Sequence, residues 1–121
     1  MTTVLIVDDE IDFAETLAER LSLRNIEARV ATGAEEAMAL LQQDYRPDAI
    51  LLDLKMPGMD GLQTLAAIKK HDPSITVIMV TGHGSTSAGM EGMRLGLAEY
   101  LLKPVDIGVI VDRIEQAAKG R

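Results

Sequence analysis

The chain has 121 residues, of which 47% are hydrophobic and 26% charged, a balance typical of one soluble globular domain over residues 1–121. Acidic residues outnumber basic ones by 19 to 12, so the formal net charge is −7, which argues against a nucleic-acid-binding face. Without cysteine, the chain has no disulfide, thiolate zinc site or cysteine nucleophile. The chain shows no apolar run of membrane-spanning length and no signal peptide, so we expect a cytoplasmic protein that does not enter a membrane.

Short apolar runs alternate with stretches of helical period from one end of the chain to the other. The predicted strands, which are rich in Val, Ile and Leu, are residues 4–7, 26–31, 49–52, 75–80 and 99–102. The predicted helices, which place apolar residues three or four positions apart, are residues 13–24, 34–41, 62–71, 83–97 and 105–119, and Asp72-Pro73 closes the third of them.

The helix expected within residues 83–97 is the least regular of the five. It contains Gly84, Gly89, Gly92 and Gly96. Each interior glycine costs a helix about 1 kcal/mol relative to alanine. We therefore expect this helix to be short or loosely held.

Five tandem strand–helix units predict an α/β fold, a single doubly wound five-stranded parallel sheet with five helices on its two faces. The flavodoxin-like strand order 2-1-3-4-5 fits best, because the first, third, fourth and fifth strands are the most apolar and so the most central, whereas the strand at residues 26–31 alternates in polarity and is more exposed. In such sheets, ligands bind beyond the carboxyl ends of the strands.

Polar residues follow four of the predicted strands at that edge. Asp8 and Asp9 end the first strand, Asp53 the third, Thr81 the fourth and Lys103 the fifth. Three carboxylates in one pocket repel one another, and Mg²⁺ with its preference for oxygen ligands removes this conflict. A lysine and a threonine beside them suit a phosphoryl group, and an aspartate can accept one as an acyl phosphate.

Four segments make the whole chain resemble a receiver domain of a two-component response regulator. They are residues 4–10 (VLIVDDE), 51–61 (LLDLKMPGMDG), 80–82 (VTG) and 100–104 (YLLKP). The resemblance implies a phosphoprotein that signals rather than an enzyme with an external substrate. Asp53 would take a phosphoryl group from a histidine kinase or a phosphotransfer protein. The face formed by the fourth helix, fifth strand and fifth helix would then signal to an effector domain or partner protein.

The resemblance also implies roles around Asp53. It places Asp9, Asp53 and the main-chain carbonyl of Lys55 on Mg²⁺, with Asp8 assisting through water. It places Thr81 and Lys103 on the phosphoryl oxygens.

The fifth strand carries two further implied features. Tyr100 would be a rotamer switch, and the peptide bond between Lys103 and Pro104 would be cis, a form available at modest cost only before proline. Gly89 and Gly92 stand where the family often has helix-forming residues, which concerns the rigidity of the fourth helix and not the chemistry.

Two side chains are candidates for setting the lifetime of the phosphorylated state. Lys55 lies two residues after Asp53, and His83 two after Thr81, so both should border the path of an attacking water. Lys55 would block that water or bind a phosphoryl oxygen, whereas His83 would orient the water. The alternative is that both side chains point to solvent and have no effect.

Other interpretations of the same residues exist. Asp8 and Asp9 could simply be caps of the first helix with no metal-binding role, and Tyr100 could be a structural residue rather than a switch. A phosphatase of the haloacid dehalogenase type also uses Asp, Thr and Lys around Mg²⁺, but it needs an Asp-x-Asp nucleophile motif after the first strand. Here the motif at Asp53 reads DLK and the acidic pair comes first. A receiver-like binding module with a decayed site is disfavoured because every site residue is present.

Overall fold

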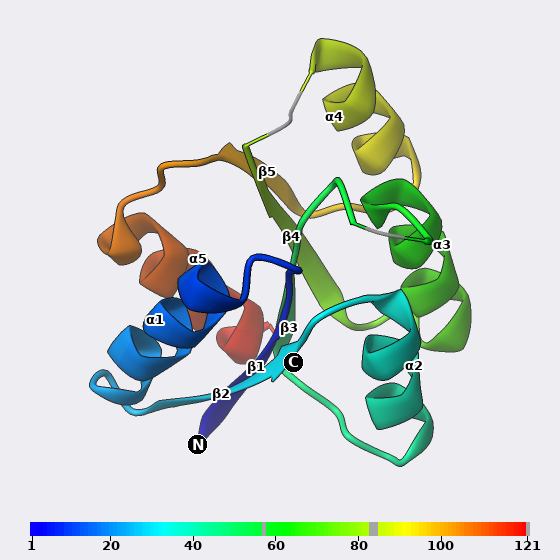
Figure 1. The fold of residues 1–121 in the computed structure, drawn as a ribbon. Coiled ribbons are helices and arrows are strands. Elements are labelled where there is room, and N and C mark those ends of the chain that lie inside the picture. Colours follow the sequence, from blue (N-terminus) through cyan, green and yellow to red (C-terminus); the bar gives the residue numbers. More distant parts are fainter. Residues whose placement is uncertain (57, 83–84, 121) are drawn as a thin grey trace.

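A computed structural model describes residues 1–56, 58–82 and 85–120. Within these residues the chain forms a five-stranded parallel sheet in the order β2-β1-β3-β4-β5, flanked by five helices, as the sequence predicts (Figure 1). The strands are β1 (Thr2–Val7), β2 (Ile26–Ala31), β3 (Ala49–Leu52), β4 (Thr76–Thr81) and β5 (Glu99–Leu102). The helices are α1 (Ile11–Ser22), α2 (Ala34–Gln42), α3 (Gly61–His71), α4 (Thr86–Arg94) and α5 (Ile107–Lys119).

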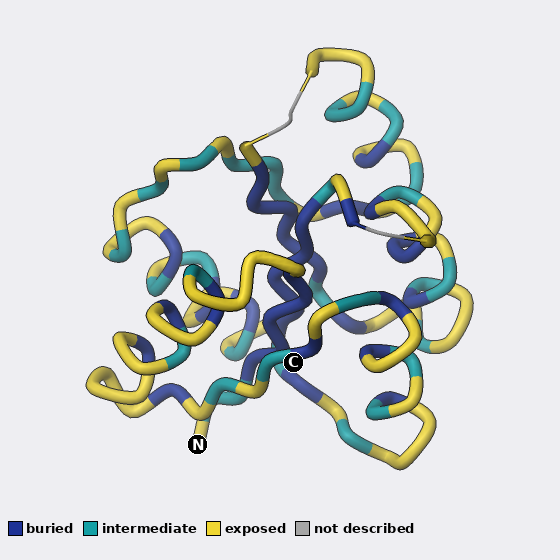
Figure 2. The backbone as a smooth tube through the Cα atoms, viewed as in Figure 1, coloured by how far each residue is buried: buried dark blue, intermediate teal, exposed yellow. Residues whose placement is uncertain are grey.

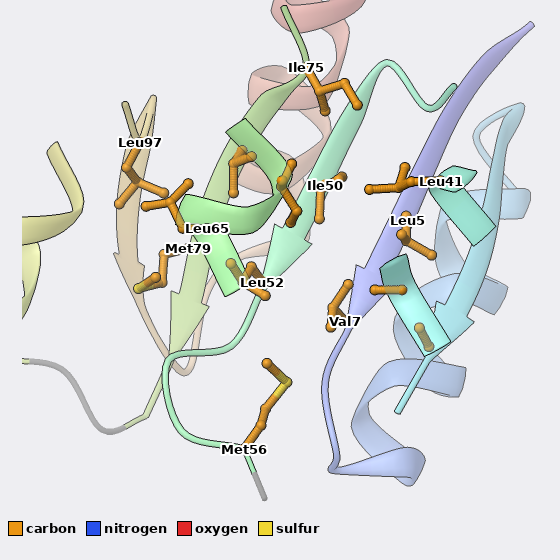
Figure 3. Packing of buried hydrophobic residues seen from close by; sticks show 14 residues of the cluster. Leu5, Val7, Leu41, Ile50, Leu52, Met56, Leu65, Ile75, Met79 and Leu97 are labelled. Atoms are coloured by element: carbon orange, nitrogen blue, oxygen red, sulfur yellow. The ribbon is translucent and has the colours of Figure 1, made fainter. Parts of the chain in front are cut away.

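The helices divide between the two faces of the sheet, with α1 and α5 on one face and α2, α3 and α4 on the other (Figure 1). Alternate residues of each central strand point to opposite faces. Thus Leu5 and Val7 join one buried cluster, while Val4 and Ile6 join the other. The central strands are buried along most of their length (Figure 2), and Figure 3 shows the cluster under α2 and α3.

Several element boundaries differ from the sequence prediction by a few residues: β4, for example, spans Thr76–Thr81 rather than residues 75–80, and α1 spans Ile11–Ser22 rather than residues 13–24. Two of the differences, at the starts of β1 and α5, have a local cause. β1 begins at Thr2 rather than at residue 4, because Thr2 and Thr3 continue the parallel pairing with β2 although they are not apolar. α5 begins at Ile107 rather than at residue 105, because Asp106 caps it by accepting a hydrogen bond from the Gly108 N–H at 2.7 Å.

α4 is a short helix of nine residues, as its glycines suggest. Ser85 caps its start by accepting a hydrogen bond from the Ala88 N–H. Gly96, two residues after its end, has a φ of +101°, a backbone conformation that residues with a side chain rarely adopt. No helix in the described part of the chain is long and apolar enough to cross a membrane.

Candidate functional site

Backbone hydrogen bonds align the ends of neighbouring strands and so bring the predicted site residues together. The Asp53 N–H donates to the Val7 carbonyl at 3.0 Å, which places Asp53 beside Asp8. The Lys103 N–H donates to the Thr81 carbonyl at 2.8 Å, which joins the ends of β4 and β5. Asp8, Asp53, Thr81 and Lys103 therefore lie at one edge of the sheet, as the order of the strands predicts.

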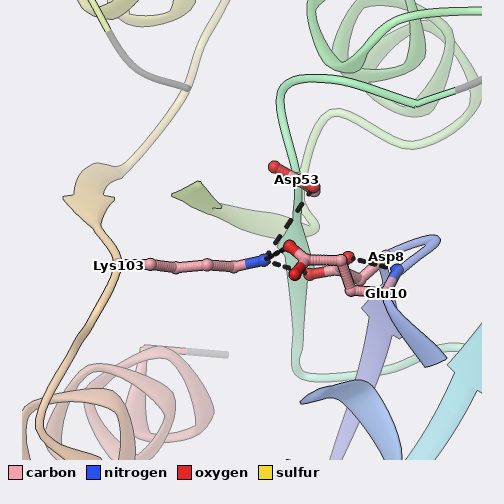
Figure 4. Close-up of polar contacts among 4 residues, drawn as sticks. All are labelled: Asp8, Glu10, Asp53 and Lys103. Carbon is pink, nitrogen blue, oxygen red and sulfur yellow. Dashed lines mark hydrogen bonds and ion pairs between the residues drawn. The ribbon is translucent and has the colours of Figure 1, made fainter. Parts of the chain in front are cut away.

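The Lys103 side chain reaches across this edge to three carboxylates (Figure 4). Its Nζ lies 2.9 Å from Asp8 Oδ2, 2.6 Å from Glu10 Oε1 and 4.0 Å from Asp53 Oδ2. Its fourth neighbour is the ring of Phe13 on α1, whose centroid is 4.1 Å from Nζ. The ammonium thus sits closer to Asp8 and Glu10 than to Asp53.

Burial and charge act in opposite directions on the ionisable groups here. Burial raises the pKa of the Asp8 carboxyl, and the hydrogen bonds from Lys103 and the Glu10 N–H offset this only in part. Burial by itself would lower the pKa of Lys103, but the hydrogen bonds to Glu10 and Asp8 together with the charges of Asp8 and Asp53 outweigh it and raise that pKa. Burial therefore decides the direction of the pKa shift at Asp8, whose side chain is 3% exposed, but not at Lys103, whose side chain is 13% exposed.

The carboxylates suit a divalent cation. Oxygens of Asp8, Glu10 and Asp53 lie within 4.8 Å of one another. Among the described residues, the buried side-chain oxygen left without a hydrogen-bond partner is Asp53 Oδ1. A hard cation such as Mg²⁺ takes carboxylate oxygens of this kind together with waters and phosphate oxygens. The donor set therefore fits Mg²⁺.

Glu10 is the member of this group that the sequence analysis did not single out. It directly follows the Asp8–Asp9 pair, so a run of three acidic residues was the available signal. Asp9, expected on the metal, is exposed and is not part of the group that the structure gathers. Its role on Mg²⁺ stays a prediction.

The remaining predicted residues surround Asp53 at different depths. Thr81 is fully buried at the end of β4, and Lys55 is exposed two residues after Asp53. The start of α3 lies close to the residues that follow β3, since the Gly61 N–H donates to the Leu54 carbonyl at 2.6 Å. A Cβ on Gly61 would lie 2.4 Å from the Asp53 carbonyl oxygen, so only glycine fits there. His83 lies outside the described residues, and the effect of Lys55 and His83 on lifetime remains untested.

Tyr100 on β5 faces α4. Its Oη accepts a hydrogen bond from the Ser85 N–H at 3.0 Å, and its ring lies against Gly89. The ring is partly exposed, and it borders an apolar groove of about 510 Å³ with Met90, Met93 and Leu102. The peptide bond between Lys103 and Pro104 is cis.

Comparison with known proteins identifies the family. The model of the response regulator receiver domain matches residues 4–115. The chain is 31% identical to the chemotaxis protein CheY of Listeria monocytogenes, with 98% of this chain and 100% of CheY covered. It is 33% identical to the regulatory protein AtoC of Escherichia coli, with 93% of this chain and 25% of AtoC covered.

Solved structures agree with this match. The receiver domain of NtrX from Brucella abortus has a TM-score of 0.89 and 32% identity, with 98% of this chain and 99% of that chain covered. A CheY-like receiver domain protein from Methanospirillum hungatei has a TM-score of 0.93 and 27% identity, with coverage of 99% and 95%. The chain spans a quarter of the length of AtoC and of FleR from Pseudomonas aeruginosa, but all of CheY. With its fold and the carboxylate–lysine arrangement at its strand ends, the chain belongs to the response regulator receiver domains.

Proposed function

We propose that this receiver domain accepts a phosphoryl group on Asp53, in a reaction that depends on Mg²⁺. The donor is a sensor histidine kinase or a phosphotransfer protein in the cytoplasm, and the domain catalyses only its own phosphorylation and dephosphorylation. One observation carries this proposal: Asp53 is 1% exposed, lies 4.0 Å from the Lys103 ammonium and keeps one oxygen without a hydrogen-bond partner. A buried carboxylate with a free oxygen is placed to act as a nucleophile.

The chain's own residues would divide the work. A carboxylate oxygen of Asp53 forms a bond to phosphorus while the bond to the donor's leaving group breaks, and the leaving group keeps the electron pair. Lys103 then offers its positive charge, and Thr81 its hydroxyl, to the phosphoryl oxygens. Asp8, Asp9, Asp53 and the Lys55 carbonyl would hold Mg²⁺, which when bound neutralises negative charge on the transferred group.

The identity of the phosphoacceptor can be tested with a small donor. Acetyl phosphate and Mg²⁺ should add one phosphate to the wild type and none to Asp53→Asn, because the amide is not a competent nucleophile. Intact-mass spectrometry measures the modified fraction. Asp12→Asn removes the same charge from an exposed position in the first turn of α1 and should be phosphorylated like the wild type. An unchanged phosphorylated fraction in Asp53→Asn would falsify the assignment.

The output face would consist of α4, β5 and α5. Met90, Met93 and Leu102 are large apolar side chains that stay exposed there. Phosphate on Asp53 would give Thr81 a new hydrogen-bond acceptor and leave space for Tyr100 to turn inward, so one local charge change would bias a two-state element. Relatives as short as CheY and as long as AtoC support either a partner protein or an attached effector domain as the receiver of the signal.

Hydrogen exchange with and without beryllofluoride, a mimic of the phosphoryl group, tests this face. We expect altered amide protection in α4 and β5, where the hydrogen bond from the Ser85 N–H to Tyr100 Oη would break. Asp53→Asn treated in the same way is the control and should show no change. Changes confined to α1 and α2 would contradict the proposed output face.

A further inference from the structure

The Lys103 ammonium is held by three neighbouring side chains, although Lys103 itself lies on a loop. Asp8 and Glu10 accept its hydrogen bonds at 2.9 and 2.6 Å, and the Phe13 ring covers it at 4.1 Å. All three side chains come from β1's end and the start of α1, whereas Lys103 follows β5. We call Asp8, Glu10 and Phe13 the ammonium seat.

The ammonium seat overlaps the position expected for a cation. Nζ lies within 4.0 Å of an oxygen from each of Asp8, Glu10 and Asp53, the same three carboxylates whose oxygens could hold a metal ion. Two cations cannot share these oxygens without strong repulsion. A metal ion bound to Asp8 and Asp53 would therefore repel the ammonium and weaken its hold on these carboxylates.

Glu10 and Phe13 differ from Asp8 in what they offer. The Glu10 side chain is 58% exposed, and the Phe13 ring has no oxygen that could ligate Mg²⁺. Phe13 interacts with the ammonium through its ring face, an attraction that disappears when Lys103 leaves. Phe13 can thus act on the metal site only through Lys103.

We propose that Glu10 and Phe13 are positioning residues that hold Lys103 in the cation position of the metal-free protein, and thereby set the affinity for Mg²⁺ and the release of Lys103 toward the phosphoryl group. The inference rests on the proposed function for its significance. Because the ammonium and the metal ion compete for the same carboxylates, metal binding and the release of Lys103 from the ammonium seat are coupled. Lys103 would be available to phosphoryl oxygens when the cation is in place.

A double-mutant cycle between Phe13 and Lys103 tests this proposal. Mg²⁺ alone is titrated into each protein, and the dissociation constant is obtained from amide chemical shifts. Phe13→Leu should tighten Mg²⁺ binding by about two- to fivefold, because it weakens the hold on the ammonium without altering any charge or ligand. Lys103→Met should tighten it further. In the Lys103→Met background, Phe13→Leu should have no effect.

A second substitution and a spectroscopic signal guard against a merely structural effect. Phe13→Met, which also keeps apolar volume, should change the affinity in the same direction as Phe13→Leu. The ε-methylene protons of Lys103 should resonate upfield in the metal-free wild type, because they lie near the ring, and should move downfield as Mg²⁺ binds. An unchanged affinity in Phe13→Leu, or an equal change with and without Lys103, would overturn the proposal.

Glu10 is tested by the same logic with allowance for its charge. Glu10→Gln removes an attractive charge and also loosens Lys103, so it should weaken Mg²⁺ binding less when Lys103 is present than in Lys103→Met. Asp12→Asn is the matched control for lost charge and should weaken binding equally in both backgrounds. Equal effects of Glu10→Gln in both backgrounds would exclude its holding role. These titrations contain no phosphoryl donor, so they are independent of the Asp53→Asn experiment.

Discussion

The centre of the sheet and the α4–β5 region differ sharply in how they are held. β3 is buried at every residue, and α1 beside β1 buries Ala14, Leu17 and Leu21. By contrast, α4 buries only Gly92, and no residue of β5 is buried. The protein thus places Asp8 and Asp53 at the ends of firmly packed strands, whereas the exposed apolar side chains of Met90, Met93 and Leu102 lie on elements with little packing.

This difference separates two tasks. Asp53 must keep its position relative to Asp8 within fractions of an ångström, which dense packing on both faces of β3 provides. An element that changes shape in response to a local charge must have a small free energy of opening, and few buried contacts provide that. The comparison therefore predicts that equivalent changes will have unequal consequences in the two regions.

The largest expected difference between the two regions is in the free energy of unfolding lost when a large apolar side chain is shortened to alanine. Leu52, which directly precedes Asp53, is fully buried, and Leu52→Ala should lower the free energy of unfolding by about 2–5 kcal/mol. Met93 on α4 is 55% exposed, and Met93→Ala should change it by less than about 0.5 kcal/mol. Urea denaturation measures both. Similar losses for the two variants would show that α4 is packed as firmly as β3.

Replacing a glycine by alanine in each region should give a smaller difference in the free energy of unfolding. A Cβ at Gly61 would meet backbone atoms of Asp53 and Leu54 at 2.4 to 2.9 Å, so Gly61→Ala should cost about 1–3 kcal/mol and displace the Asp53 loop. At Gly92, the Cβ would meet Leu97 Cδ2 at 2.9 Å, and a side-chain end can move.

The strain at Gly92 is also opposed by the gain of about 1 kcal/mol from replacing glycine in a helix. Gly92→Ala should therefore change the free energy of unfolding by less than about 1 kcal/mol. Gly82→Ala is the control for adding a methyl group near the site, because no atom of the described residues other than its chain neighbours lies within 4 Å of the added Cβ. A greater loss for Gly92→Ala than for Gly61→Ala would contradict the contrast.

The strands and the sheet edge that carries the site could be predicted from the sequence, whereas the side-chain contacts at that edge could not. Apolar runs that end in Asp8 and Asp53 fix both the strands and the sheet edge where these residues meet, because strand order and side-chain alternation leave few choices. The hydrogen bond from Lys103 to Glu10 joins residues 93 positions apart and depends on side-chain rotamers. No periodicity encodes such a contact, and the same holds for the Phe13 ring over the ammonium.

The smallest expected effect is a pH dependence at the edge of the α4–β5 region. Lys69 of α3 lies beside Gly96, and its Nζ donates to the Ile75 carbonyl at 2.7 Å. Burial lowers the pKa of Lys69 below its ordinary value of 10.5, although the charge of Asp72 opposes the shift. The folded protein therefore binds this proton more weakly than the unfolded chain does.

The sign of the effect follows from this proton balance. As the pH rises from the folded-state pKa of Lys69 toward 10.5, the unfolded chain holds more protons, so the free energy of unfolding increases. The neutral amine can still donate to the Ile75 carbonyl. The free energy of unfolding of the wild type relative to Lys69→Met should thus rise with pH in this window, by less than about 1 kcal/mol because the side chain is only partly buried. Lys70→Met, at the exposed neighbouring position, is the control for the lost charge, and its difference from the wild type should not show this rise. A wild-type advantage over Lys69→Met that falls with pH would mean that the charge of Asp72 outweighs burial in setting the pKa of Lys69.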